Sequence, residues 1–430
     1  MRTLVTIVCP VFGLLTLFGI GIGAELRAAS SVPAASPSLT APAGPTFTGR
    51  RGVGGMPNFF FPRQHPLDPN RYDFEPCSRW DTTMPRWRLD EIKRAGFDFL
   101  RLTIDPGPLL EAEGEIFDRR ISEIKGAIES SLTAGLKILI DVHVRTSHPM
   151  WGQFQITAGF DHPAFRRYIE VVQALGRLAS AYDPEKLALE VFNEPPGPCQ
   201  WHDRPDWPEQ LEKIYSVARQ AAPDHTLVVS GSCYASIKGL VRLDGSKFDN
   251  NTIFSFHYYD PFVFTHQSFW ASMKFLEHIS RLPYPPGSAD IEEVLDAVEQ
   301  RIRATPNLSD DQRISEIREA AKYLRAYFAN WKGAANIERD FNEVQQWANR
   351  YGIQPKRILL GEFGVMRDVY GHKGADPADR IRWLSDTRMI AEKFGYSWSV
   401  WSFTGTMGMT IGDTDGPLDS NMLKALGLTP

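Results

Sequence analysis

Two glutamates each stand at the end of a short apolar segment of this 430-residue chain. Asn193-Glu194-Pro195 follows the apolar residues 187–191, and Gly361-Glu362-Phe363 follows residues 357–360. Two facing carboxyl groups could cleave an acetal, because one protonates the leaving oxygen while the other, ionised, stabilises or attacks the oxocarbenium-like carbon. Their surroundings must then hold the two pKa values apart. A lone glutamate is usually an exposed ion or a salt-bridge partner, so the paired placement is what indicates chemistry.

Other polar and aromatic side chains stand within or just after neighbouring apolar segments, namely Arg101, His143, Asn193, His257, Tyr259 and Trp401. We expect Arg101 and Tyr259 to hydrogen-bond Glu362, and the arginine to keep that carboxylate ionised and oriented. Asn193 is suited to bind a sugar 2-hydroxyl, and Trp401 to form the floor beneath the sugar ring under attack. His143 and His257 could bind hydroxyl groups, or could be neutral histidines satisfied by backbone groups.

The elements that must position these residues are eight short apolar segments that alternate with amphipathic ones. The expected strands are 51–54, 97–103, 137–142, 187–191, 226–229, 252–256, 357–360 and 396–400, with helices at 116–134, 163–181 and 208–222 among them. This alternation indicates a parallel sheet covered by helices. Eight units favour an α/β fold of the (β/α)8, or TIM, barrel type, in which the site lies at the C-terminal ends of the strands. No GxGxxG turn supports a dinucleotide-binding sheet.

Roughly 100 residues separate the sixth and seventh expected strands, which is more than a barrel unit requires. Residues 290–304, 309–331 and 336–351 all have helical patterns, and the last can serve as the barrel helix. The first two predict a helical insertion at about 285–333. It could form a wall of a substrate cleft or be a purely structural addition, and the sequence leaves both open.

The N-terminus has the pattern of an export signal. Residues 4–22 are apolar and are followed by small residues, which predicts a signal peptide over residues 1–29. Proline and glycines within the stretch favour cleavage over a retained membrane anchor. Residues 30–48 are an expected Ala/Ser/Pro-rich linker and 49–430 the catalytic domain. We therefore expect a secreted or periplasmic protein without stable membrane association after cleavage. We also expect it to be a monomer.

Export leaves three cysteines, Cys77, Cys199 and Cys233. An odd number allows at most one internal disulfide. Cys199 and Cys233 each follow a predicted strand, and those two strands are expected to be neighbours. They are therefore the best candidate pair.

Composition and the remaining motifs narrow the possible partners. The formal net charge of −5 and the lack of a long basic run argue against nucleic acid. His143 and His148 lack the HExxH spacing of a zinc-protease site, and Asp413-Thr-Asp415 lacks the later ligands of a calcium loop, so neither of these metal sites is expected. Aromatic residues on the rim loops could stack on sugars or simply pack their loops; these are Trp80, Trp151, Trp201, Trp207, Phe262 and Trp270, of which Trp151 and Trp201 are assigned to substrate binding.

Residues 187–195 closely resemble the signature of glycoside hydrolase family 5, the cellulase-type members of clan A. The resemblance spans roughly 49–428 and matches eight active-site positions in order, namely Arg101, His143, Asn193, Glu194, His257, Tyr259, Glu362 and Trp401. It implies a retaining double displacement without cofactor, with Glu362 as nucleophile and Glu194 as acid/base. Pro196, Gly54 in the first strand and the insertion depart from the family pattern. They touch the cleft and remove no catalytic group.

The resemblance also implies a polysaccharide or oligosaccharide substrate. Likeness to endoglucanases favours β-1,4-glucan, while β-1,3- or mixed-linkage glucan, mannan and a bacterial exopolysaccharide stay open. A glucan transglycosylase would use the same carboxyl pair. A non-catalytic carbohydrate-binding protein is disfavoured, because both glutamates and Arg101 are present.

Overall fold

The computed structural model describes residues 44–430, except for 56–58, 60, 61, 63, 66, 75–83, 145–147, 198, 200–206, 270–272, 288 and 413–415. The expected signal peptide, most of the expected linker, Cys77 and Trp201 therefore lie outside the described residues. Within the described ranges, we find no helix that combines the length and apolar character needed to cross a membrane.

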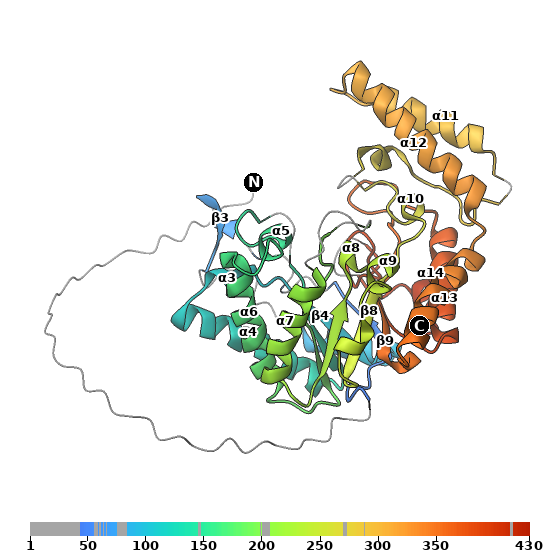
Figure 1. The fold of residues 1–430 in the computed structure, drawn as a ribbon. Helices are drawn as coiled ribbons and strands as arrows, with labels where there is room; N and C mark the ends of the chain where they lie inside the picture. The colour runs from blue at the N-terminus through green and yellow to red at the C-terminus, as the bar shows by residue number, and fades with distance from the viewer. Residues whose placement is uncertain are drawn as a thin grey trace, which may run out of the picture. The chain divides into compact units, whose positions relative to one another are not determined.

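Eight parallel strands form a closed barrel at the centre of the fold (Figure 1). They are β1 (Arg51–Val53), β4 (Phe99–Ile104), β5 (Lys137–Val142), β6 (Leu187–Glu190), β7 (Thr226–Ser230), β8 (Thr252–His257), β9 (Ile358–Glu362) and β10 (Ser397–Val400). Each strand pairs with the next along the chain, and β1 closes the barrel by pairing with both β4 and β10. The predicted (β/α)8 barrel is confirmed.

Helices surround the strands on the outside (Figure 1). The longer ones are α2 (Arg86–Ala95), α4 (Gly114–Thr133), α6 (Pro163–Ala179), α7 (Trp207–Ala221), α13 (Ala334–Arg350) and α14 (Pro377–Lys393). Short helices lie in the connections, namely α3 (Gly107–Glu111), α5 (Gln153–Ile156), α8 (Ser232–Ala235), α9 (Ile237–Leu240), α10 (Phe262–Thr265), α15 (Ser420–Ala425) and the 3-10 turns η2 (Gly245–Lys247), η3 (Lys274–His278) and η4 (Pro355–Arg357). In α6 the buried residues Phe165, Tyr168, Val172, Leu175 and Ala179 recur at intervals of three and four, which turns one face of the helix to the barrel.

The barrel interior is filled from its N-terminal end by an apolar layer. Phe99, Leu139, Ala188, Val228, Ile253 and Leu359 come from six successive strands and form one buried cluster with Phe47. Their neighbours along each strand, such as Leu100 and Ile138, belong to the separate outer core beneath the helices. Successive residues of a strand point to opposite faces, so one set fills the barrel and the other anchors the helices. A fully buried residue of this kind contributes about 1.5–3 kcal/mol.

The same alternation places a polar layer directly above the apolar one. Five polar residues each stand two residues after a member of the interior cluster, namely Arg101, Asp141, Glu190, Ser230 and Ser255. All five are buried. The barrel interior thus changes from apolar to polar over two residues along these five strands, toward their C-terminal ends.

The predicted insertion between the sixth and seventh barrel strands is confirmed. It is a hairpin of α11 (Ile291–Ala304) and α12 (Asp310–Asn330), drawn in yellow and orange in Figure 1. Ser309 and Gln312 form a capping box that fixes where α12 begins. The hairpin contacts η3 and α10 in the loop after β8, and His278 of η3 hydrogen-bonds Glu316 of α12 at 3.0 Å.

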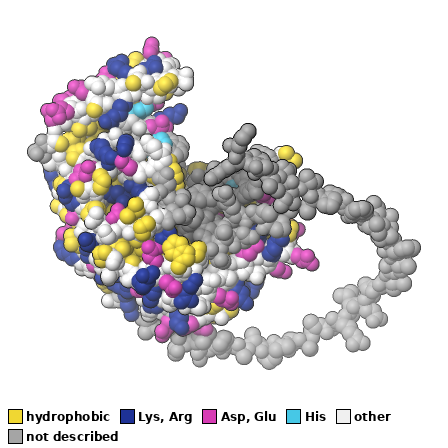
Figure 2. All heavy atoms as spheres, turned by 180° about the vertical axis from the view of Figure 1, so that it is seen from behind, with side chains coloured by type: hydrophobic (Ala, Val, Ile, Leu, Met, Phe, Trp, Pro, Cys, Tyr) yellow, Lys and Arg dark blue, Asp and Glu magenta, His cyan; other side chains and the backbone are white. Residues whose placement is uncertain are grey.

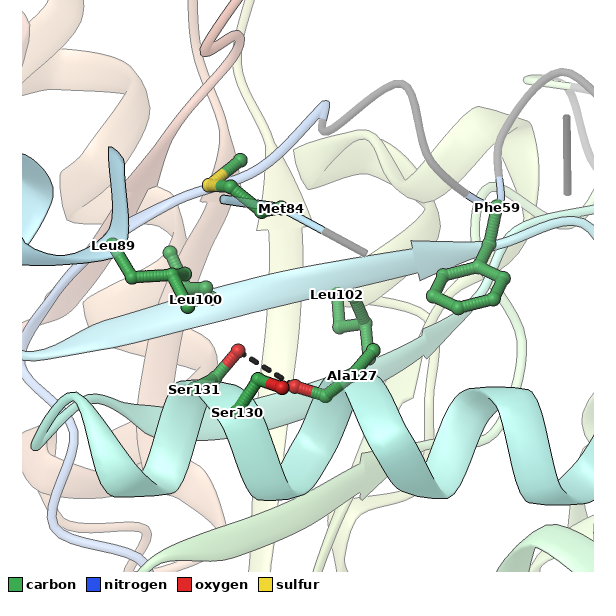
Figure 3. A pocket seen from close by; sticks show the side chains of 8 residues that line it. All are labelled: Phe59, Met84, Leu89, Leu100, Leu102, Ala127, Ser130 and Ser131. Atoms are coloured by element: carbon green, nitrogen blue, oxygen red, sulfur yellow. Dashed lines mark hydrogen bonds between the residues drawn. The ribbon is translucent and has the colours of Figure 1, made fainter. Parts of the chain in front are cut away.

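A small apolar pocket lies outside the barrel, between β4 and α4 (Figure 3). Leu100 and Leu102 line it from the strand, Ala127 and Ser131 from the helix, and Ser131 Oγ donates to the Ala127 carbonyl at 2.8 Å. Its volume of about 20 Å³ holds no more than about one water molecule. This pocket is a packing gap rather than a site.

Some features of the chain were not predicted. A two-stranded antiparallel ribbon of β2 (Gln64–His65) and β3 (Asp68–Tyr72) precedes α2. Its strands are short, the second contains Pro69, and neither carries a clear alternation. On the face seen in Figure 2, basic and acidic side chains are interspersed, in keeping with the small net charge.

Candidate active site

A fully buried arginine lies at the centre of the polar layer. Arg101 Nε donates to Glu190 Oε2 at 2.7 Å, and Nη1 donates to Glu362 Oε1 at 2.5 Å. Nη2 donates to Asn193 Oδ1 at 2.6 Å, and Asp141 Oδ2 lies 3.0 Å from Nη1. Burial disfavours the charged guanidinium, but attraction to the three carboxylates outweighs it and holds the pKa of Arg101 well above its ordinary value. One cation thus faces three buried carboxyl groups.

Glu362 points into the barrel because β9 contains a bulge. The β8–β9 pairing joins Phe256 to Leu360 and His257 to Glu362, so Gly361 is an extra residue. Regular alternation would give Glu362 the outward direction of Leu360, which packs in the outer core. The extra residue reverses that direction. A Cβ at Gly361 would lie 2.3 Å from Ser255 Oγ and 3.1 Å from His257 Nε2, so glycine is required there.

The Glu362 carboxylate is enclosed by hydrogen-bond donors. Its side chain is 4% exposed. Oε1 accepts from Arg101, and Oε2 accepts from the Tyr259 hydroxyl at 2.9 Å. Burial raises the pKa of Glu362 above its ordinary value, and the positive field of Arg101 opposes that rise. Two hydrogen-bond donors, one of them the Arg101 cation, thus oppose the effect of burial and favour the ionised carboxylate.

Glu194 follows β6 in an unusual backbone conformation. Its φ is +43°, in the left-handed region, which costs an L-residue about 1–2 kcal/mol. Its side chain keeps 27% exposure, and Oε1 lies 2.8 Å from His257 Nδ1. The surrounding protein still disfavours the charged form, and burial raises the pKa of Glu194 to about 7. At neutral pH this carboxyl group can therefore either give or take a proton.

The two glutamates lie close together. One oxygen of Glu194, one oxygen of Glu362 and one nitrogen of His257 all lie within 4.8 Å of one another. Carboxyl pairs about 5–5.5 Å apart act by double displacement, whereas about 6.5–9.5 Å is needed to seat a water for direct displacement. The spacing fits the first arrangement.

Two neutral histidines link these groups. His143 Nδ1 lies 3.0 Å from Asp141 Oδ2, and its Nε2 lies 3.1 Å from Asn193 Nδ2. A carboxylate accepts and an amide nitrogen donates, so the His143 proton resides on Nδ1. Burial lowers the pKa of His257 to about 4, which leaves it neutral at pH 7. Among the described residues, His257 Nε2 has no hydrogen-bond partner, so its one proton is best placed on Nδ1 between the two glutamates.

A pocket of about 180 Å³ opens above the carboxyl pair. It is lined by Glu194, Glu362, His143, Tyr259 and Trp401, and from the surrounding loops by His266, Phe269, Met366, Thr406 and Met407. The Trp401 ring is stacked on His143 at a centroid distance of 5.3 Å and an interplanar angle of 19°. The pocket thus has an aromatic wall beside two carboxyl groups.

The structure brings together all eight residues that the resemblance implies. Five line the pocket, and Arg101, Asn193 and His257 hydrogen-bond them or one another from below. Trp151 is partly buried against the outer core and is not among the described residues that line this pocket. Trp201 lies outside the described residues. Trp207, expected on a rim loop, instead begins α7, is 4% exposed, and donates to the Ser230 carbonyl, so it is a core residue.

Sequence reasoning missed three residues of this network. Asp141 and Glu190 bond Arg101 from β5 and β6, and strand alternation could have found them, since each stands two residues after an interior apolar residue. His266 lines the pocket, and its ring stacks on that of Phe262 at a centroid distance of 3.8 Å. No pattern in the sequence indicates His266, because it lies in the irregular loop after α10.

Known proteins resemble this chain over most of its length. Residues 86–406 match the family model described as Cellulase (glycosyl hydrolase family 5). Endoglucanase C of Acetivibrio thermocellus is 23% identical over 341 residues, which cover 78% of this chain and 88% of that protein. The clostridial cellulose synthase subunit Z of Clostridioides difficile has a TM-score of 0.60 at 21% identity and covers 88% of this chain and 99% of its own. Thermotoga maritima Cel5A in complex with cellobiose has a TM-score of 0.58 at 23% identity, covering 88% of this chain and 97% of its own.

The charge balance around Arg101 leads to a stability prediction. Arg101→Met should lower the free energy of unfolding at pH 7 by about 3–5 kcal/mol, because it leaves buried carboxylates without their cation. In the wild type burial already raises the pKa values of Asp141, Glu190 and Glu362 above their ordinary values, and loss of the cation would raise them further. The folded variant would then take up protons as the pH falls, so its deficit against the wild type should shrink between pH 7 and pH 4.5.

Urea unfolding at both pH values measures this deficit. Arg94→Met, which removes an exposed arginine from the last turn of α2, should cost less than about 1 kcal/mol at either pH. A deficit for Arg101→Met that stays constant or grows on acidification would contradict the assignment of Arg101 as the counter-ion of the cluster.

Proposed function

We propose that this chain, which belongs to glycosyl hydrolase family 5, is an exported, retaining endo-β-glucanase that cleaves β-1,4-linked glucan. Membership of the family makes it a glycoside hydrolase. The observation that carries the proposal is the pairing of Glu194 and Glu362, whose carboxyl oxygens lie within 4.8 Å in two different environments. Glu362 is enclosed by Arg101 and Tyr259, while Glu194 has a pKa of about 7.

In the first step Glu362 attacks the anomeric carbon, and Glu194 gives its proton to the departing glycosidic oxygen. The bond between carbon and that oxygen breaks, and a glycosyl ester forms on Glu362. Arg101 and Tyr259 hold the nucleophile in one orientation through their hydrogen bonds, which saves the cost of ordering it during the reaction. The leaving sugar departs as a neutral alcohol because it carries the proton of Glu194.

In the second step Glu194 acts as a base. Ester formation removes the negative charge of Glu362, and the loss of that neighbouring charge lowers the pKa of Glu194. The ionised Glu194 then takes a proton from a water that attacks the anomeric carbon from the side the leaving group vacated. As the bond to water forms, the ester bond between the anomeric carbon and Glu362 breaks, so the product keeps the β configuration and both carboxyl groups return to their starting states.

Other residues position the sugar. Asn193 is held by Arg101 through its oxygen and by His143 through its amide, which leaves one amide hydrogen for a sugar 2-hydroxyl. Trp401 lines the pocket beside His143 and offers an apolar face to the ring under attack. These contacts suit a pyranose ring that carries a 2-hydroxyl group.

The choice of β-1,4-glucan rests on the likeness to Endoglucanase C, which extends over most of both chains. The same carboxyl pair would also serve β-1,3- or mixed-linkage glucan, mannan, or transfer to a sugar acceptor. The Cys199–Cys233 disulfide is the pair expected from the sequence. It supports export, because disulfides persist in oxidising compartments.

Removal of either glutamate should separate the two roles. Glu362→Ala and Glu194→Ala should each lower kcat/KM on cellotetraose by several orders of magnitude. Sodium azide can replace a missing carboxylate at the anomeric carbon. With an aryl β-cellobioside, Glu362→Ala should then give the α-glycosyl azide by direct attack, and Glu194→Ala the β-glycosyl azide by attack on the glycosyl-enzyme. Product NMR distinguishes the two.

Glu343→Ala, an exposed glutamate of α13, is the matched control and should keep normal activity. Near-normal turnover of cellotetraose by either catalytic variant, or azide products of the opposite configuration, would overturn the assignment.

The proton held by Glu194 predicts the alkaline limb of the pH profile. Burial raises its pKa to about 7, and the group must be protonated in the first step. The value of kcat/KM on a cello-oligosaccharide should therefore fall as the pH rises, with a midpoint near 7. Glu194→Gln, assayed with a dinitrophenyl cellobioside that needs no acid, should lack this limb. A limb that persists in the variant would assign the titration to another group.

A further inference from the structure

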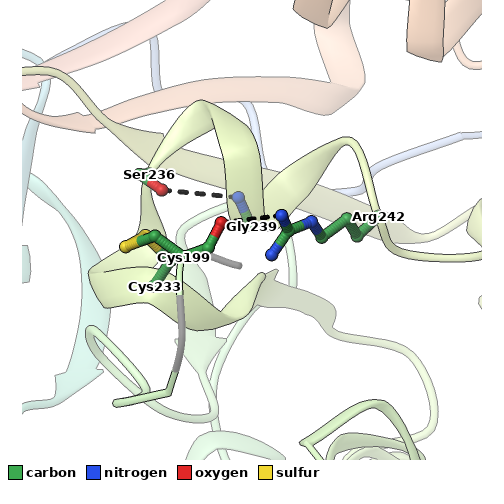
Figure 4. Close-up of a disulfide and its surroundings, with 5 residues drawn as sticks. All are labelled: Cys199, Cys233, Ser236, Gly239 and Arg242. Carbon is green, nitrogen blue, oxygen red and sulfur yellow. Dashed lines mark hydrogen bonds between the residues drawn. A yellow bond between two sulfur atoms is a disulfide. The ribbon is translucent and has the colours of Figure 1, made fainter. Parts of the chain in front are cut away.

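The loop that carries Glu194 is tied to the loop after β7 by three contacts. The Cys199–Cys233 disulfide joins them (Figure 4). The Tyr234 backbone N–H donates to the Pro195 carbonyl at 3.1 Å, and Arg242 Nη2 donates to the Cys199 carbonyl at 2.7 Å. Pro195 directly follows Glu194, and Cys199 is five residues beyond it. The segment that follows Glu194 is thus held against the loop after β7.

The neighbouring segment holds an unusual conformation. Cys233, Tyr234 and Ala235 have φ values of 58°, 55° and 54°. L-residues visit the left-handed region singly and at an energetic cost, and a consecutive run persists only where the surroundings over-determine it. The run turns the Tyr234 N–H toward Pro195 and the Cys233 sulfur toward Cys199.

The backbone on either side of this run is closely packed. A Cβ on Gly239 of α9 would lie 1.8 Å from the Ser232 carbonyl, and one on Gly231 would lie 2.2 Å from the Gly239 carbonyl carbon. Ser236 caps α9 by accepting from the Gly239 N–H, which Figure 4 shows beside the disulfide. Backbone therefore packs on backbone, which leaves α8 and α9 little freedom to shift.

Glu194 stands between two fixed points. Before it, Asn193 is bonded to Arg101 and its backbone N–H donates to the Val142 carbonyl. After it, Pro195 is held by Tyr234. The left-handed φ of Glu194 depends on both, since a free chain would relax to a commoner conformation. We propose that the Cys199–Cys233 disulfide is a positioning device for Glu194, which holds its carboxyl group where it protonates the departing oxygen.

This inference rests on the proposed acid/base role of Glu194, and it differs from a general contribution to stability. A positioning role affects only the steps that need the Glu194 proton. The parameter kcat/KM reports the first step, in which a sugar leaving group needs that proton and a 2,4-dinitrophenolate leaving group does not. Loss of the disulfide should therefore impair the two kinds of substrate unequally.

The test compares Cys199→Ala/Cys233→Ala with the wild type on cellotetraose and on 2,4-dinitrophenyl β-cellobioside. We expect kcat/KM to fall about 10-fold or more on cellotetraose, as for a small misplacement of a catalytic group, and less than about 2-fold on the aryl substrate. Equal losses on both substrates, or no loss on either, would overturn the proposal.

Two controls keep the result interpretable. Leu324→Ala removes a fully buried side chain of α12 and should lower the melting temperature without changing the ratio of the two kcat/KM values. Cys77→Ser removes a cysteine outside the disulfide and should leave both values unchanged. If the double variant does not fold, wild-type protein reduced with dithiothreitol replaces it. Reduction of the disulfide takes two electrons and two protons and yields two thiols, which thiol labelling counts. The same unequal loss is expected.

Glu194→Ala, measured on the same two substrates, separates the two proposals. If its loss is confined to cellotetraose and the disulfide variant shows equal losses, the acid role stands and the positioning role fails. If Glu194→Ala impairs both substrates equally, the acid role itself is wrong, and the positioning proposal falls with it.

Discussion

Arg101 is fully buried in the barrel, and its guanidinium group bonds residues from three other strands or their ends. Glu190, Asn193, Glu362 and the nearby Asp141 surround it. Taking an ion out of water costs several kcal/mol, so this cation is stable there only because the carboxylates compensate it. They in turn fix the next residues. Asp141 orients His143, His143 accepts from Asn193, and Glu362 accepts from Tyr259. The arrangement of the pocket follows from where one positive charge is held.

The difference between the two glutamates arises from their different exposure and their different positions relative to Arg101. Glu362 lies deep, 4% exposed, beside the cation. Glu194 lies at the pocket mouth, 27% exposed, with a neutral histidine as its nearest partner. Proximity to Arg101 favours the charged form of one, while burial without that contact favours the protonated form of the other. The local cost of the left-handed Glu194, about 1–2 kcal/mol, is small beside the burial of the barrel core.

Much of the architecture could be predicted from the sequence because apolar periodicity governs it. The eight strands and the insertion hairpin lie within a few residues of their predicted ranges, and Cys199 pairs with Cys233 because their strands are neighbours. The direction of Glu362 could not be predicted from periodicity, since alternation alone would turn it outward with Leu360; the bulge at Gly361 decides it. Trp207 was misassigned because the start of α7, rather than its residue type, determines that it packs in the core. His266 depends on an irregular loop for which no periodic rule exists.

The central claim is that Glu362 forms a covalent bond to the sugar. A 2-deoxy-2-fluoro cellobioside with an activated leaving group should trap this intermediate. The fluorine destabilises the oxocarbenium-like transition states of both steps, whereas the activated leaving group speeds only the first, so the glycosyl-enzyme accumulates. Digestion and mass spectrometry then locate the label. The account predicts one fluorocellobiosyl group per chain, on the peptide that contains Glu362. A label on Glu194 or on another residue, or full turnover of the compound without any adduct, would contradict it.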